Sequence, residues 1–147
     1  MPPNLITPYA MPRAGKKFAF VGYPSTKGTV DRIAHDLRSA SYAYLSAPAP
    51  AETYAKLNLN PRFHIVLPFS KRGIVDLDGK SFNFPKPNGI SGAPLWELQM
   101  PEAGGRRVVG VMIEHRRQKG VLIATDIAAV LLMLRDYYEA NSTGKAT

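Results

Sequence analysis

The stretch that decides the fold, residues 89–98, reads GISGAPLWEL. Gly89 and Gly92 bracket Ser91, and they predict a tight turn because glycine adopts backbone angles that are closed to other residues. Residues 94–98 then predict a strand. A turn followed by a strand differs from the Gly-X-Ser-X-Gly nucleophile elbow, in which a helix follows the serine and a glycine would replace Ala93.

Downstream of this stretch, the pattern predicts two more strands and a helix. Residues 107–113 and 120–124 are rich in β-branched residues and predict the strands. Thr125 or Asp126 is suited to cap the helix, because its oxygen accepts from free amides of the first turn. Apolar residues at spacings of three and four then give one face that we expect to pack on the sheet: Ile127, Val130, Leu131, Leu134 and Tyr138. The helix is expected to end over Asn141, Ser142 and Gly144.

Upstream, residues 1–16 hold four prolines and predict an extended lead-in. Strands are expected over 17–21, 37–45 and 63–69, a short helix over 51–59, a hairpin-like region over 71–78 and an irregular, rigid loop over 83–94. About six strands followed by one helix predict a mainly β fold, an antiparallel six-stranded Greek-key-like barrel closed by a C-terminal α-helix. We expect one domain over 17–140, followed by a flexible tail over 141–147.

The serine in this turn is a candidate nucleophile. Acyl transfer needs backbone N–H donors aimed at the developing oxyanion, and a glycine-bracketed turn can supply them. Here the donors would be the amides of Gly89 and Ser91. The competing interpretation of the hexapeptide alone is a structural turn without chemistry.

The surroundings of the turn favour the chemical interpretation. The serine loop, the three strands that follow it and the terminal helix resemble the second barrel of trypsin-like serine peptidases, which would make this chain half of a double barrel. Residues 20–24, FVGYP, look like the strand end that opens this barrel in bacterial members. The resemblance covers roughly residues 17 to 138.

The resemblance implies roles for individual residues. Ser91 would be the nucleophile, and the backbone of Gly89 and Ser91 the oxyanion hole. The segment Ile113, Glu114 and His115 would lie on the strand along which a polypeptide substrate pairs, and Lys86, in the loop 85–88, would wall the specificity pocket. Two positions depart from the family pattern: Ile90 replaces an acidic residue that pairs with a freed N-terminus, and Ala93 replaces a glycine.

The general base and its orienting aspartate are the parts that we expect to be missing. In the family they come from a preceding barrel, and only about 17 residues precede this one. We expect His64 to be a core or barrel-face residue, His115 to lie on the substrate side, and His35, beside Asp31 and Asp36, to be a surface residue. A serine without a base is a poor nucleophile, so we expect the chain alone to be inactive. A first barrel acting in trans would be its partner, and self-association is a further expectation.

The alternative function is a non-catalytic β-barrel module that binds a peptide or a polyanion. The net charge of +8 would favour weak, salt-sensitive attraction to polyanions. Because the basic residues are scattered rather than set in one stripe, we do not expect specific nucleic-acid binding. Zero cysteines and three dispersed histidines give no expected metal site or cofactor. No stretch is apolar enough to span a membrane, and we expect a cytoplasmic location.

Overall fold

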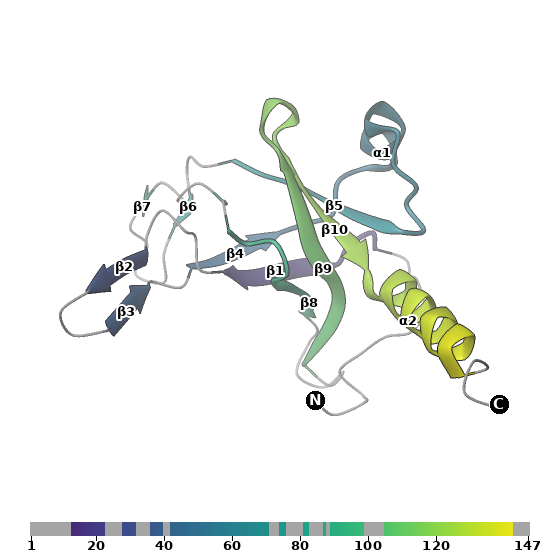
Figure 1. Ribbon diagram of the computed structural model, residues 1–147. Coiled ribbons are helices and arrows are strands. Elements are labelled where there is room, and N and C mark those ends of the chain that lie inside the picture. The colour runs from purple at the N-terminus through teal and green to yellow at the C-terminus, as the bar shows by residue number, and fades with distance from the viewer. Residues whose placement is uncertain are drawn as a thin grey trace.

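The computed structural model describes residues 13–22, 28–31, 36–39, 42–70, 74–75, 81–82, 87, 89–98 and 105–142. Six strands form one antiparallel sheet: β1 (Lys17–Gly22), β4 (Tyr42–Ser46), β5 (His64–Pro68), β8 (Pro94–Leu98), β9 (Arg106–Arg116) and β10 (Val121–Asp126). Their order is β4-β1-β8-β9-β10-β5. The sheet curls through 215° into a half-barrel, in which the long β9–β10 hairpin stands steeply across β1 and β4 (Figure 1).

Smaller elements complete the described chain. The strands β2 (Gly28–Asp31) and β3 (Asp36–Ser39) pair with each other, as do β6 (Ile74–Val75) and β7 (Ser81–Phe82). Two α-helices, α1 (Ala51–Leu57) and α2 (Ile127–Ser142), and the 3₁₀ turn η4 (Arg117–Lys119) are the helical parts of these residues. The element η4 forms the tip of the β9–β10 hairpin.

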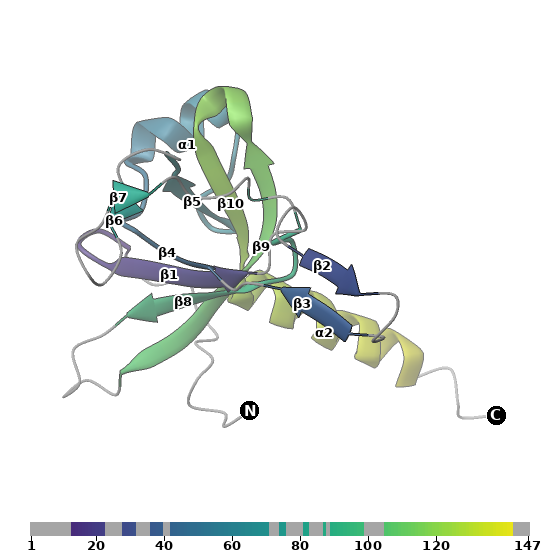
Figure 2. The same cartoon turned by 90° about the vertical axis from the view of Figure 1, so that its left-hand side faces the viewer.

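The two edge strands of the half-barrel, β4 and β5, are linked by individual hydrogen bonds rather than by a strand ladder. The Tyr44 hydroxyl donates to the carbonyl of Pro68 over 3.0 Å. The chain beyond β4 adds a backbone bond, from the amide of Ala49 to the carbonyl of Val66, over 2.8 Å. The curl that brings these edges together is seen from the side in Figure 2.

Side chains from alternate positions fill the inside of the curl. The buried cluster on the concave face draws on every strand of the sheet, and its largest fully buried members are Phe18, Phe20, Ile65, Leu67, Leu95, Met112 and Leu122. The opposite face of β5 and β10 carries a second cluster, which α1 covers with Tyr54 and Leu57. Period-two alternation therefore gives the sheet one continuous inner core and a smaller outer one.

Asp126 fixes the start of α2. Its Oδ1 accepts from the amide of Ala128 over 2.8 Å, which caps the helix as the sequence predicts. The other oxygen, Oδ2, accepts from the Arg13 guanidinium over 2.5 Å, and Arg13 also donates to the carbonyls of Pro61 and His64, each over 2.7 Å. Arg13 thereby ties the residues before β1 to the helix and to the start of β5.

The sheet and the C-terminal helix agree with the sequence prediction, whereas some strand bounds and the packing of the helix differ. A mainly β, six-stranded antiparallel sheet with a C-terminal helix is confirmed. The single strand expected over 37–45 is wrong, because β3 and β4 are separate strands that pair with β2 and β1. The expectation that the apolar face of α2 packs is correct only for its first turn, where Ile127, Ala128 and Ala129 are buried. Leu134 and Tyr138, from the expected face, are exposed.

Candidate functional site

The Ser91 turn is a glycine-dependent β-turn. The amide of Ala93 donates to the carbonyl of Ile90 over 3.0 Å, which closes a four-residue turn with Ser91 and Gly92 in its centre. Gly92 has φ = 89°, and the only non-glycine residue with positive φ in the described chain is Asn58, so the turn is type II. Gly89, with φ = 86°, adds a second left-handed residue before the serine. The sequence prediction of a tight, glycine-bracketed turn is confirmed.

The turn is held against β9 by two hydrogen bonds to one residue. The amide of Gly92 donates to the carbonyl of Met112 over 2.8 Å, and the amide of Met112 donates to the carbonyl of Ala93 over 2.9 Å. Met112 is itself fully buried in the inner core, as is Ile90, which is 5% exposed. A buried apolar side chain at position 90 anchors the turn in the core and places no charge there that would need a partner.

Ser91 lies exposed on the outside of this anchored turn. Its hydroxyl donates to the carbonyl of Ile113 over 3.4 Å, a long and weak bond. That carbonyl is available because Ile113 is the extra residue of a β-bulge: Glu114 pairs with Ile123 while Met112 pairs with Ala124. Bulges beside functional sites redirect backbone and side-chain groups in this way.

Two backbone donors without a partner lie within two residues of this hydroxyl along the chain. Among the described residues, the amides of Gly89 and Ser91 make no hydrogen bond, whereas the amide of Gly92 is bonded. Unbonded amides at alternate positions of an exposed turn are suited to bind an oxyanion when they converge on it. The arrangement therefore offers an exposed hydroxyl and two unbonded amides on an anchored turn.

Two of the three histidines, His64 and His115, belong to the described residues. Within the described residues, no histidine hydrogen-bonds to Ser91. His64 is the first residue of β5, it is half-buried, and its Nδ1 lies 3.2 Å from the carbonyl of Asn60. His115 packs edge-on against Phe69, with ring centroids 5.1 Å apart. His35 lies outside the described residues, whereas its neighbours Asp31 and Asp36 lie in β2 and β3.

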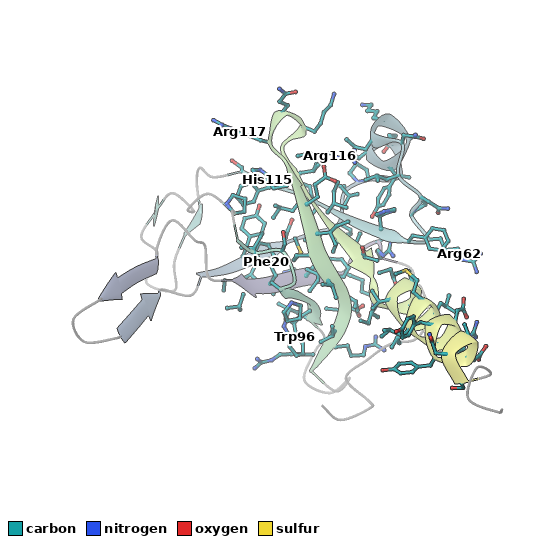
Figure 3. The ribbon with its side chains drawn as sticks, viewed as in Figure 1. Phe20, Arg62, Trp96, His115, Arg116 and Arg117 are labelled. Carbon is teal, nitrogen blue, oxygen red and sulfur yellow. The ribbon has the colours of Figure 1, made fainter. Side chains whose placement is uncertain are left out.

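The proposed substrate strand has an open side. The strand β8 pairs with β9 only up to Val111, so within the described residues Glu114 and His115 have a strand neighbour only in β10. Glu114 is exposed and pairs with Arg116 over 2.9 Å. Figure 3 shows His115, Arg116 and Arg117 following one another toward the tip of the hairpin. Lys86, expected in the pocket wall, lies outside the described residues.

Buried charges of the sheet are paired, and they lie elsewhere. Glu97, on β8, is 4% exposed and accepts from Lys16 over 2.9 Å and from Arg107 over 3.3 Å.

Burial raises the pKa of Tyr44 above its usual value of 10.0, against the lowering effect of hydrogen bonds from Ser70 and Ser46. In the described part of the chain, no three His, Cys, Asp or Glu side chains gather as metal ligands. No helix of these residues is long and apolar enough to cross a membrane.

Two features around Arg13 could not be predicted from the sequence. Arg13, assigned to an extended lead-in, anchors that segment to Asp126. An apolar groove of about 570 Å³ is lined by residues 13–15, 47–51, 54 and 61. Only the run of small residues APAPA at 47–51 hints at it in the sequence.

A scan of protein-family models and a search of curated proteins found no match to this chain.

Proposed function

We propose that this chain is a serine-peptidase-related domain, the second barrel of a trypsin-like peptidase, which carries the nucleophile Ser91 and is inactive without a base that the described residues do not supply. The observation that carries the proposal is the anchored turn, which exposes a serine hydroxyl beside the unbonded amides of Gly89 and Ser91.

The strand order supports the fold part of the proposal. The strands β8, β9 and β10 follow one another as antiparallel neighbours, and β5, which precedes them, lies beside β10. This is the arrangement of a Greek key, in which a long connection returns a strand to the far side of a meander. The link from Tyr44 to Pro68 joins the two edges, as expected for a barrel that closes through side chains.

The missing base determines the expected activity. Ser91 needs a group that takes its proton during attack, and its hydroxyl contacts only a carbonyl acceptor in the described residues. Without the base, rate falls by several orders of magnitude, and only the contribution of the oxyanion donors remains. A polypeptide that brings a histidine and an aspartate to the open side of the turn would complete the site.

A fluorophosphonate probe tests this proposal in two steps. The purified chain alone should not be labelled above the level of a Ser91→Ala variant, and labelling of the wild type would contradict the absence of a base. Imidazole should then act as a soluble base and raise labelling at Ser91, mapped by peptide mass spectrometry. Ser70, which is also exposed, is the matched control and should stay unlabelled. If imidazole labels both serines equally, the turn confers no reactivity and the proposal fails.

The open side of β9 favours a second candidate function, a peptide-binding module without catalysis. Residues 114–116 lack a strand neighbour on one side in the described chain, and an extended peptide can add a strand to such an edge. Binding of extended peptides together with an unreactive Ser91 under imidazole would favour this function. Polyanion binding would instead weaken steeply with salt.

A further inference from the structure

The outer face of β4, β1 and β8 is apolar although no helix covers it within the described residues. The register places Ala19 beside both Leu45 and Trp96, so these three side chains share one face, opposite to the inner residue Phe20. Leu45 is 67% exposed and Val21, two residues after Ala19 on the same face, is 44% exposed. Trp96 lies at the lower edge of the sheet, away from Phe20 (Figure 3). Strands that are apolar on both faces are normally covered on both faces.

The outer layer of the half-barrel stops short of these strands. The helix α1 covers β5 and β10, and α2 contacts β9 and β10. Beyond its first turn, α2 leads away from the sheet in both views (Figures 1 and 2). Its direction is set by the Asp126 cap and by the bond from Arg13, so α2 of the same chain does not cover its own strands β1 and β4.

The helix α2 carries the second uncovered apolar surface. Met133, Leu134, Tyr137 and Tyr138 lie on one side, because residues three and four apart on a helix are neighbours. They are between 47% and 68% exposed. On the other side, Arg135 pairs with Asp136 and with Glu139. An apolar stripe along a helix normally packs against another element.

We propose that two copies of this chain form a dimer in which α2 of each copy packs on the outer face of β4, β1 and β8 of the other. A sheet face and an apolar helix are natural neighbouring layers, and a reciprocal contact closes into a symmetric dimer. The proposal does not depend on any role of Ser91.

Charge favours a second copy as the occupant. The chain carries a net charge of +8, so most of its surfaces repel a second copy. The helix α2 is an exception, because it holds one arginine against two carboxylates. The outer face is bordered by the exposed cations Lys17 and Arg106. Both lie opposite Leu98 in the sheet register, Lys17 on β1 and Arg106 on β9. The acidic excess of the helix thus meets a basic rim.

Cross-linking tests the dimer, since the chain has no native cysteine. We would make Leu45→Cys and Met133→Cys, two substitutions at exposed positions that leave the core intact. A short bis-maleimide should join a Leu45→Cys chain to a Met133→Cys chain in a mixture, and neither variant to itself. Lys119→Cys, at the hairpin tip, is the matched control and should not cross-link to either.

Each other outcome overturns the proposal. Self-linked Met133→Cys alone would mean that two helices pair, and self-linked Leu45→Cys alone would mean that two sheets pair. A monomer at every concentration in sedimentation equilibrium would mean that the occupant is another protein. If the dimer forms, Leu45→Glu and Tyr137→Glu should each raise its dissociation constant by about tenfold or more, with unchanged circular dichroism.

Discussion

Removal of the Asp126 carboxylate should be the most destabilising single change outside the inner core. The carboxylate caps α2 at the amide of Ala128 and neutralises Arg13, and both charged side chains are largely buried, at 15% and 6% exposure. Loss of an N-cap costs about 1 kcal/mol. Removing one partner of a buried ion pair costs about 3–5 kcal/mol, because the other charge stays uncompensated. Since Arg13 keeps two carbonyl acceptors, we expect Asp126→Ala to lower the free energy of unfolding by about 3–5 kcal/mol in total.

Urea unfolding followed by the fluorescence of Trp96, the only tryptophan, measures this loss. The same loss corresponds to a fall in Tm of roughly 6–20 °C for a domain of this size. Asp126→Asn keeps the cap and should cost about 1 kcal/mol less than Asp126→Ala. Glu114→Ala breaks an exposed pair with Arg116 and should cost less than about 1 kcal/mol. The reasoning is refuted if Asp126→Ala is as mild as Glu114→Ala, or if the effects of Arg13→Ala and Asp126→Ala add fully in a double-mutant cycle.

Three further changes test other parts of the structure. Gly110→Ala would place a Cβ 2.7 Å from the carbonyl oxygen of Thr125, so β9 and β10 must separate; we expect a loss of about 1–3 kcal/mol in urea unfolding, and a neutral result would contradict the close approach. Gly92→Ala meets no atom within 4 Å but forces a side chain to φ = 89°; the strain should cost about 1–2 kcal/mol, and an unchanged Tm would argue against the type II turn. Tyr44→Phe loses the bond to Pro68 and should cost about 0.5–1.5 kcal/mol at neutral pH. Because the pKa of Tyr44 is raised in the fold, its contribution to stability is full below pH 10 and is lost as pH rises through the folded pKa. In urea unfolding at increasing alkaline pH, the free energy of unfolding of Tyr44→Phe should therefore fall less steeply with pH than that of the wild type. Equal slopes would contradict the burial of the hydroxyl.

Local patterns predicted the elements whose causes are local. The Asp126 cap, the turn at Gly89 and Gly92 and the strands β1 and β8 depend on neighbouring residues, and all of them are present. The helix face at Leu134 and Tyr138 was expected to pack because periodicity reports that a surface is apolar, not what covers it. Here the described chain supplies no cover beyond the first turn.

Features set by pairing between distant segments could not be predicted. The bulge at Ile113, which frees a carbonyl for Ser91, arises from the register of β9 against β10. The role of Arg13 depends on Asp126, 113 positions away. The division of residues 37–45 into β3 and β4 follows from two different partner strands. None of these leaves a signal in the spacing of apolar residues.

The central claim is that Gly89 and Ser91 present their amides to a tetrahedral oxyanion on the Ser91 oxygen. Amide spectra of the ¹⁵N-labelled chain, titrated with an arylboronic acid in the presence of imidazole as the base, test it most directly, because a tetrahedral boronate on the serine places a negative oxygen beside the Ser91 oxygen. The account predicts that the Gly89 and Ser91 amide signals move downfield, that the Gly92 signal, already bonded to Met112, stays in place, and that Ser91→Ala abolishes the shifts. Shifts that are absent, or that survive Ser91→Ala, would contradict it.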